Sequence, residues 1–578
     1  MIKIKNHNQL QIFDLWSHLG PKRRKLLNES WAGLFQKELL PVLPVEKLIP
    51  FFKEDVGRPT KELNTSIGII LFQQIFDLTD DETIEQLAFN IQWHYALNIP
   101  EESDDIKYLS PKTLWNLRDL FVKNSLEEDI FDSIRDKLAK IFDVDTRKQR
   151  IDSVHIKSNM RKLGRIRLIA NTIKKFLSNL NRHHKELFES LEDNLIERYM
   201  LKKSGQPFSM VKPSESSKTL KIICKDLLFL IEQFKDLSEI SRMNSYQLME
   251  RVLEEQCIVT ISGKDKDVEI KKPKDIPSNS LQNPSDEDAS YSGHKGQGYQ
   301  VQVMETYNTE EESPEKKSQI LNLINHVEVE PAHESDANAI IPAIESTEMK
   351  GTKPEEVLAD SLYGSEKNIQ EAQNNDVDII SPLMGASVKS DRIELSDFQF
   401  GENGKIVKCP KNQTPIKHKI KKSGRHTVTF KKSTCENCSL KDKCPVVKGK
   451  KYYYLRFSNS DLEISNRRVF ESSDEFKEKY RWRSGVEATM SEFDRKTGVK
   501  HLRVRGLAKV RFAAVLKSIG INIFRATRVR KARNEEILAF IVINYIFSIV
   551  KKQLDESFIA IESFFLFFKK FSKYTSVC

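Results

Sequence analysis

Apolar residues recur at helical spacing through most of the first 145 residues. Between residues 67 and 91 they follow the 3.6-residue period of a helix packed on one face, at Ile67, Ile70, Leu71, Ile75, Ile84, Leu87 and Ile91. Asp80 or Asp81 is a candidate cap for the second helix of this stretch. Ser110 before Pro111 predicts another helix start, because a capping hydroxyl there precedes a proline at the first helical position. The pattern predicts an N-terminal helical domain over residues 1–145.

The period changes near residue 148, where KQRIDSVHIKSN alternates and carries β-branched residues typical of a strand. Similar runs follow in GYQVQVMETYN, INHVEVEP, EEVLAD and DVDIISPL. Between the last two lies SLYGSEKNIQEAQNN, which predicts a helix capped by Ser365. Alternating strands and helices favour an α/β core with a mixed sheet.

Insertions split this core into residues 146–165, 290–400 and 455–530. Residues 166–262 return to the helical period and predict a helical insertion. Residues 263–289 are rich in Lys, Asp, Pro and Ser and predict an exposed linker. Residues 401–454 predict a basic, Cys-containing insertion, and residues 531–578 a helical tail with apolar helices near 537–550 and 558–571.

The composition indicates a globular protein of several domains, since 39% of 578 residues are hydrophobic and 30% are charged. This excludes disordered and fibrous classes. The net charge of +10 is modest but clustered, with 16 Lys or Arg and two acids between residues 405 and 456. Such a patch favours a phosphate backbone as partner.

The expected location is the cytoplasm. The first residues lack the apolar run of a secretory signal, and the seven cysteines fit a reducing compartment. The longest apolar run, residues 537–550, is too short to span a bilayer comfortably. We therefore expect no membrane association.

The segment YRWRSGVEATMSEFDRKTGVKHLRVRGLAK, residues 480–509, combines a carboxylate with a basic run. On one helix, Tyr480, Arg483 and Glu487 share a face. An adjacent apolar stripe would hold that helix to a core, and Gly498 predicts its end; the stripe comprises Val486, Met490 and Phe493.

Two aspartates give Glu487 candidate partners. Asp152 lies in the predicted strand IDSVHI, and Asp360 ends the predicted strand of VLADSLYG. Carboxylates at strand ends can project into a cleft, and their oxygens are the ligands that Mg²⁺ prefers. Two such ions can activate an attacking oxygen and stabilise a leaving one in phosphodiester chemistry.

These motifs together resemble the DDE transposases of bacterial insertion sequences, which have a ribonuclease H-like catalytic core. The resemblance covers the segments around Asp152 and Asp360, the Tyr-x2-Arg-x3-Glu helix, the R-x-RG-x2-K segment and the N-terminal stretch GRPTKELNTSIGIILFQQIFDLTDDETIEQLAFNIQWHYAL. It implies Asp152, Asp360 and Glu487 as catalytic ligands of two Mg²⁺ or Mn²⁺ ions. It implies DNA contacts from Tyr480, Arg483, Arg503, Arg505 and Lys509.

The activity that the resemblance implies is cleavage of double-stranded DNA at terminal inverted repeats, followed by strand transfer into target DNA. A homodimer bridging two ends and association with the nucleoid are expected with it. Two alternatives stay open from the sequence: a metal-dependent nuclease that does not join, and an inactive zinc-containing DNA-binding protein derived from a transposase.

One position departs from the family pattern. Related transposases carry a Lys soon after the catalytic Glu, where this chain has Asp494. Lys496 or Lys500 is a candidate replacement, while Glu492 and Asp494 are rivals of Glu487 as metal ligand. His155, three residues after Asp152, is interpreted as a structural or supporting residue.

Four cysteines form a second constellation in the basic insertion, with the spacing C-x25-C-x2-C-x5-C. Four thiolates suit a tetrahedral structural Zn²⁺ site; they are Cys409, Cys435, Cys438 and Cys444. Ordinary reduced thiols are the alternative, and His418 or His426 are possible replacement ligands.

Overall fold

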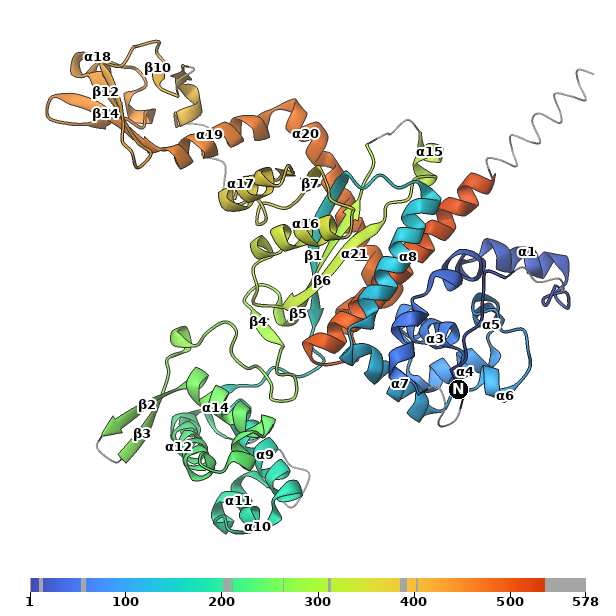
Figure 1. Ribbon diagram of the computed structural model, residues 1–578. Coiled ribbons are helices and arrows are strands. Elements are labelled where there is room, and N and C mark those ends of the chain that lie inside the picture. The colour runs from blue at the N-terminus through green and yellow to red at the C-terminus, as the bar shows by residue number, and fades with distance from the viewer. Residues whose placement is uncertain are drawn as a thin grey trace, which may run out of the picture.

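The computed structural model describes residues 2–9, 14–53, 59–200, 208, 211–262, 265–309, 313–384, 392–401 and 404–535 (Figure 1). The apolar helices expected at 537–550 and 558–571 lie outside the described residues. Among the helices that are described, none is long and apolar enough to cross a bilayer.

A mixed six-stranded sheet forms the centre of the molecule. β1 pairs antiparallel with β5 and parallel with β7, so the sheet order is β4-β5-β1-β7-β8, with β6 also paired to β5. The strands are β1 (Lys148–Lys157), β4 (Ser290–Ser292), β5 (Gly296–Thr306), β6 (Ile324–Pro331), β7 (Glu356–Leu358) and β8 (Asp378–Ile380). The mixed α/β class expected from the sequence is confirmed.

Helices cover both faces of this sheet, which explains why its strands carry apolar residues on both sides. On one face Ile151 and Val357 pack against α16 (Ile340–Met349) and α17 (Glu366–Asn374). On the other face Val154 and Val303 pack with α21 (Ser484–Thr497) and the helix of residues 507–535. Two further short elements complete this region, α15 (Pro314–Ser318) and α20 (Asp474–Tyr480).

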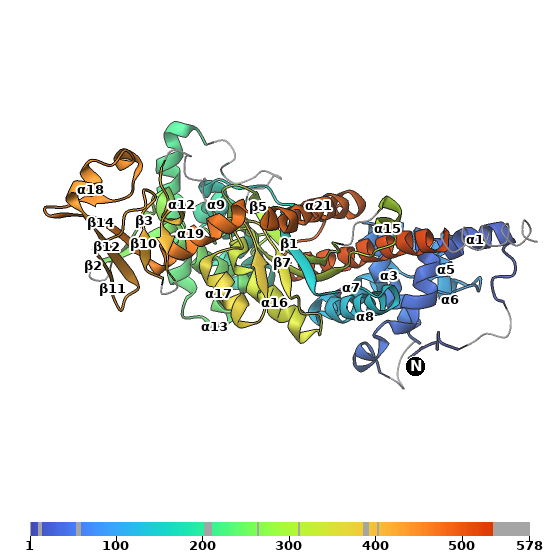
Figure 2. The same ribbon diagram turned by 90° about the horizontal axis from the view of Figure 1, so that it is seen from above.

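The N-terminal residues fold as helices that share a hydrophobic core with the helix of residues 507–535 (Figure 2). They are α1 (Pro21–Glu29), α2 (Trp31–Leu34), α3 (Leu63–Ile75), α4 (Asp80–Phe89), α5 (Ile91–Ala96), α6 (Asp104–Lys107), α7 (Pro111–Lys123) and α8 (Leu126–Phe142). The Ser110 hydroxyl caps α7 as predicted, accepting from the Thr113 amide at 3.2 Å. The cap predicted at Asp80 or Asp81 was wrong: Thr79 caps α4 in a capping box with Glu82, and Asp80 binds Arg118 instead.

A second helical unit has its own hydrophobic core and projects from the sheet (Figure 1). Its elements are α9 (Arg165–His183), α10 (Lys185–Glu189), α11 (Asp193–Tyr199), α12 (Ser216–Phe234), α13 (Ser238–Ser241), α14 (Asn244–Gln256), β2 (Cys257–Ser262) and β3 (Asp265–Ile270). The composition of residues 263–289 predicts an exposed linker, but the described part of this segment packs against the folded chain. It contributes β3, Leu281 is buried in the helical core, and the Tyr299 hydroxyl donates to Asp286 at 2.5 Å.

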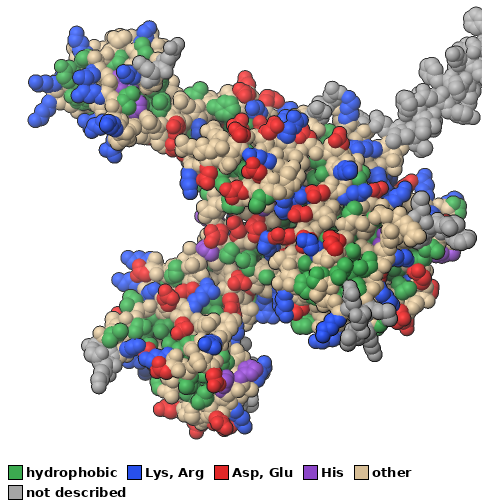
Figure 3. Space-filling model, in the orientation of Figure 1, with side chains coloured by type: hydrophobic (Ala, Val, Ile, Leu, Met, Phe, Trp, Pro, Cys, Tyr) green, Lys and Arg blue, Asp and Glu red, His purple; other side chains and the backbone are tan. Residues whose placement is uncertain are grey.

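The Cys-containing segment forms a small lobe around a four-stranded sheet, β11-β12-β14-β13. It is carried at the end of α19, away from the central sheet (Figures 1 and 2), and many Lys and Arg side chains cover its visible face (Figure 3). Its elements are β9 (Gln399–Phe400), β10 (Ile406–Lys408), β11 (Lys417–Ile420), β12 (Arg425–Lys431), α18 (Lys432–Glu436), β13 (Val447–Lys448), β14 (Tyr452–Ser458) and α19 (Asn459–Ser472).

Candidate active site

The pairing of β1 with β7 brings Asp152 and Asp360 together. The two strands run parallel, with Lys148 opposite Glu356 and Arg150 opposite Leu358. Continuing this register by two residues puts Asp360 beside Asp152, at about the 4.8 Å spacing of neighbouring strands. Both carboxylates are partly buried, and Asp360 contributes to the raised pKa of Asp152.

Arg483 connects the third acid, Glu487, to this pair of aspartates. The chain is helical from α20 through a 3-10 turn (Arg481–Arg483) into α21, so Glu487 stands one turn after Arg483. The Arg483 guanidinium donates to Asp152 at 3.0 Å and to Glu487 at 2.7 Å. One cation therefore lies between two of the three predicted acids.

The helix that carries Glu487 is held as the sequence predicts. Val486 and Phe493 are fully buried, and Met490 is buried beside them. Gly498 ends α21 in the left-handed conformation, at φ 65°, which a glycine adopts without a Cβ penalty. Buried apolar side chains thus fix the helix while the Glu487 side chain stays 64% exposed.

Charges in this cluster influence one another. Burial raises the pKa of Asp152, with Asp360 and Asp336 adding to the shift and Arg483 opposing it. Burial likewise raises the pKa of Tyr480 to about 12, and its ring stacks on Phe476 with 5.2 Å between centroids. The pKa of Arg483 is lowered by burial but raised overall by the surrounding carboxylates, Asp152 first. The cluster carries excess negative charge that favours a bound cation.

The donor set suits hard divalent ions. Three carboxylates offer the oxygen ligands that Mg²⁺ and Mn²⁺ prefer, and the Arg483 guanidinium pairs with two of them here. Among the described residues no group of three or more His, Cys, Asp or Glu side chains has the arrangement of a metal site. Divalent ions at this cluster would have to displace Arg483 from the carboxylates.

Comparison with known families adds an independent observation. Residues 408–527 match the family model described as a transposase DDE domain, and residues 32–120 match one described as a transposase domain (DUF772). The matches indicate an insertion-sequence DDE transposase. No curated protein matches the chain.

The first match spans the segment that holds Glu487, Arg483 and the four cysteines of the basic lobe, whereas Asp152 and Asp360 lie outside it. The family supports an enzymatic nuclease or transposase role and implies DNA binding. Transposases of this group generally use divalent metals.

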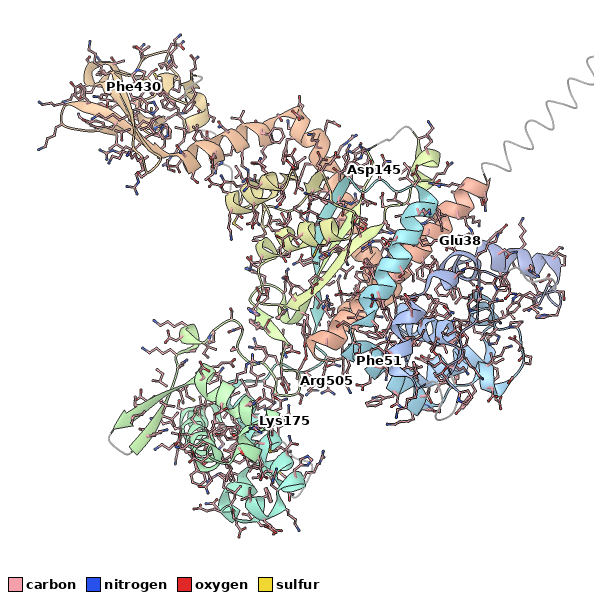
Figure 4. All side chains as sticks on the ribbon, viewed as in Figure 1. Glu38, Phe51, Asp145, Lys175, Phe430 and Arg505 are labelled. Carbon is pink, nitrogen blue, oxygen red and sulfur yellow. The ribbon has the colours of Figure 1, made fainter. Side chains whose placement is uncertain are left out.

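The basic residues that follow α21 take different positions in the structure. Arg503 pairs with Asp77 at 3.4 Å and with Glu82 at 3.8 Å, so it ties this segment to the N-terminal helices. Arg505 is exposed and lies where the core meets the helical insertion, within 3.4 Å of the Met160 sulfur (Figure 4). Lys509 is exposed beside the same N-terminal helices.

The residues that compete with Glu487 in the sequence are engaged elsewhere. Glu492 binds Lys496 at 2.8 Å and Arg525 at 2.7 Å, on another face of α21. Asp494 pairs with Lys500 at 3.4 Å and accepts from its amide, which holds the turn after the helix. Lys500, a candidate replacement for the lysine that related transposases carry at the position of Asp494, is thus paired with Asp494 itself.

Polar residues that the sequence analysis missed surround the acids. Lys295 donates to Asp336 at 3.2 Å and to the Ser153 hydroxyl at 3.1 Å, next to Asp152. The buried Tyr363 hydroxyl donates to Gln302 at 2.6 Å, and the carboxylates of Asp336 and Asp152 add to the burial that raises its pKa. No local motif marks these residues, because the sheet brings them together from distant segments. His155 is half-buried, and burial lowers its pKa.

A buried ion cluster lies under α21, and the sequence pattern did not predict it either. The Glu305 carboxylate is fully buried and binds Arg150 and Arg525, each at 2.7 Å, while Thr489 donates to it at 2.8 Å. Arg150 also donates to the Trp482 carbonyl at 2.7 Å. Gly485 leaves room for this guanidinium, since a Cβ there would stand 2.0 Å from an Arg150 nitrogen.

The four cysteines of the basic lobe line one small pocket, together with Phe398 and Phe430. Burial raises the pKa of Cys435 to about 11, and the other three thiols add to this shift, Cys444 first. The two histidines considered as replacement ligands lie elsewhere: His418 and His426 hydrogen bond to each other at 2.9 Å, and His426 to Asn459 at 2.7 Å.

Proposed function

We propose that this transposase cleaves double-stranded DNA at the ends of an insertion sequence and transfers the freed ends into target DNA. The observation that carries the proposal is the meeting of Asp152, Asp360 and Glu487: two aspartates on neighbouring parallel strands, and a glutamate joined to one of them through Arg483. This set of acids is what metal-dependent phosphodiester chemistry requires.

Each residue of the site has a proposed role. Asp152, Asp360 and Glu487 hold two Mg²⁺ or Mn²⁺ ions, which when bound supply Lewis-acid chemistry at the scissile phosphate. Arg483 then pairs with a DNA phosphate, because a guanidinium released from carboxylates can make a bidentate contact with phosphate oxygens. Tyr480 helps to position that phosphate.

DNA binding extends beyond the acids. Exposed Arg505 and Lys509 are proposed to contact the backbone, and Arg503 does so at the cost of its ion pairs with the N-terminal helices. The basic lobe of residues 401–454 is proposed to bind DNA at a distance from the acids, because α19 holds it away from the sheet (Figure 1). We propose a homodimer on two DNA ends, acting in the cytoplasm at the nucleoid.

The test uses the purified full chain and labelled duplexes made from the DNA that flanks its gene. Incubation with Mg²⁺ is expected to give both cut and joined products, and EDTA is expected to abolish both. Cutting without joining would indicate a nuclease instead. Binding without any metal-dependent cutting would indicate an inactive DNA-binding derivative.

We further propose that the four thiols of the basic lobe hold a structural Zn²⁺ ion, since they converge on one pocket and four thiolates are a preferred donor set. The purified chain is expected to retain about one equivalent of zinc after dialysis. Cys435→Ser/Cys438→Ser is expected to lose the metal and to lower the melting temperature of the lobe. Elemental analysis measures the first effect and calorimetry the second.

A matched control is Cys224→Ala, which alters a buried thiol of the helical insertion. It is expected to leave the zinc content unchanged. A wild-type chain that carries no zinc and melts at the same temperature with and without added zinc would contradict the proposal and leave the cysteines as ordinary thiols.

A further inference from the structure

A cavity of about 760 Å³ opens beside α21, on a different face of the helix from Glu487. Where it passes the start of α21 its wall is made of the small residues Ser484, Gly485 and Ala488, which leave the space unfilled. Trp482 and Tyr307 add aromatic surface. The volume lies within the range of sites that bind small molecules or parts of larger ligands.

The cavity is strongly basic. Six of its lining side chains are Arg or Lys, and one, Glu492, is acidic. Two of the arginines, Arg150 and Arg525, form the floor and are held there by the buried Glu305. Cations gathered in a concave, partly desolvated wall focus the positive potential on the space between them.

The cations at the rim remain available to a ligand. Arg495 is exposed in the last turn of α21, and within the described part of the chain it has no ion pair. Arg481 is 54% exposed, pairs with the exposed Glu478 at 3.3 Å and lies over the Trp482 ring at 5.0 Å from its centroid. Arg528 is 65% exposed and reaches Glu492 at 3.3 Å. Exposed pairs of this kind contribute little stability, so an incoming anion can replace them.

The cavity adjoins the candidate active site through two shared elements. Arg150 on its floor and Asp152 in the acid cluster are two residues apart on β1, which is about 7 Å along a strand. Trp482 and Arg483 are consecutive, one lining the cavity and the other bridging the acids. The cavity and the acids are therefore neighbours along both β1 and the helix that leads into α21.

We propose that this cavity binds the phosphate backbone of the DNA segment adjoining the one held at the acids. Arg481 and Arg495 contact its phosphates, and the buried arginines add a sequence-independent attraction. The proposal rests on the proposed function, since it assigns a further part of the same DNA to a second surface of α21. Because the contacts are to phosphates, they position the DNA and do not read its bases.

The test measures binding of a fluorescein-labelled duplex by anisotropy in EDTA, at salt concentrations between about 50 and 200 mM. Removing a phosphate contact lowers the slope of log K against log salt by about 0.9. Arg481→Gln/Arg495→Gln is therefore expected to lower the slope by about 2 and to weaken binding at least tenfold at the lower salt concentrations. Its melting temperature is expected to match that of the wild type, because both side chains are exposed.

The matched control is Arg182→Gln/Lys185→Gln in the helical insertion. Arg182 occupies the last turn of α9 as Arg495 does in α21, and Lys185 pairs with exposed Glu189 at 3.3 Å as Arg481 does with Glu478. This control is expected to leave the slope within about 0.3 of the wild type.

The outcomes separate the two proposals. If the wild type binds the duplex but the cavity variant behaves like the control, the cavity proposal is overturned and the proposed function stands. If the wild type shows no salt-dependent binding of DNA, the proposed function fails and the cavity proposal fails with it.

Discussion

Replacing Asp152 by Asn is expected to lower the rate of metal-dependent DNA cleavage by about 10³-fold, equivalent to about 4 kcal/mol of lost transition-state stabilisation. Asp152 lies centrally in the cluster, beside Asp360 in the sheet register and bound to Arg483 at 3.0 Å. The amide keeps the size of the side chain but removes the charge that a divalent ion needs. Single-turnover cleavage of a labelled end, with and without Mn²⁺, measures the effect.

Two further measurements give this result its meaning. Binding of duplex DNA in EDTA is expected to remain, because Arg483 loses a carboxylate partner and stays available to phosphate. Asp145→Asn is the matched control, since Asp145 precedes β1 and pairs locally with Arg147 (Figure 4). A cleavage rate in Asp152→Asn equal to that of the control would remove Asp152 from the site.

Local features of this chain could be predicted because short-range chemistry determines them. The strand of residues 148–157, the Ser365 cap of α17 and the stop at Gly498 each depend on a few adjacent residues. Thr79 and Asp80 show the limit of such reasoning. Both residue types cap helices, and the reciprocal bond from Glu82 selects Thr79.

The arrangement of the acids required more than local pattern. Asp152 and Asp360 are separated by more than two hundred residues, and only the parallel register of β1 and β7 brings them side by side. The three acids were grouped into one site by the resemblance to transposases, because the periodicity of the sequence does not show which acids meet. Arg483 as a bridge between Asp152 and Glu487 could not be foreseen, because it depends on how the helix that carries Glu487 packs against β1.

Replacing Glu305 by Ala is expected to destabilise the core by about 3–5 kcal/mol, because it leaves two buried guanidinium groups without their shared carboxylate. Arg150 comes from β1 and Arg525 from the helix of residues 507–535, and both bind Glu305 at 2.7 Å. The cluster therefore ties the sheet to the helices on one face. Urea unfolding, together with hydrogen exchange of the β1 and β5 amides, measures the loss.

The pH dependence of stability provides a second readout of the same cluster. Burial alone would raise the pKa of Glu305, but Arg525 and Arg150 outweigh it and lower the pKa. A carboxyl whose pKa is lowered by folding stabilises the protein above its unfolded pKa, about 4.3, and this contribution is lost as the pH falls below it. The free energy of unfolding of Glu305→Ala is therefore expected to fall less than that of the wild type as the pH is lowered.

The control for this prediction is Glu328→Ala on the neighbouring strand β6. Glu328 is 40% exposed and pairs with Arg511 at 3.5 Å, so its removal is expected to cost less than about 1 kcal/mol. A similar small cost for Glu305→Ala would mean that water reaches the two arginines once the carboxylate is gone. The floor of the basic cavity would then be held by packing around Thr489 and Trp482 and not by charge.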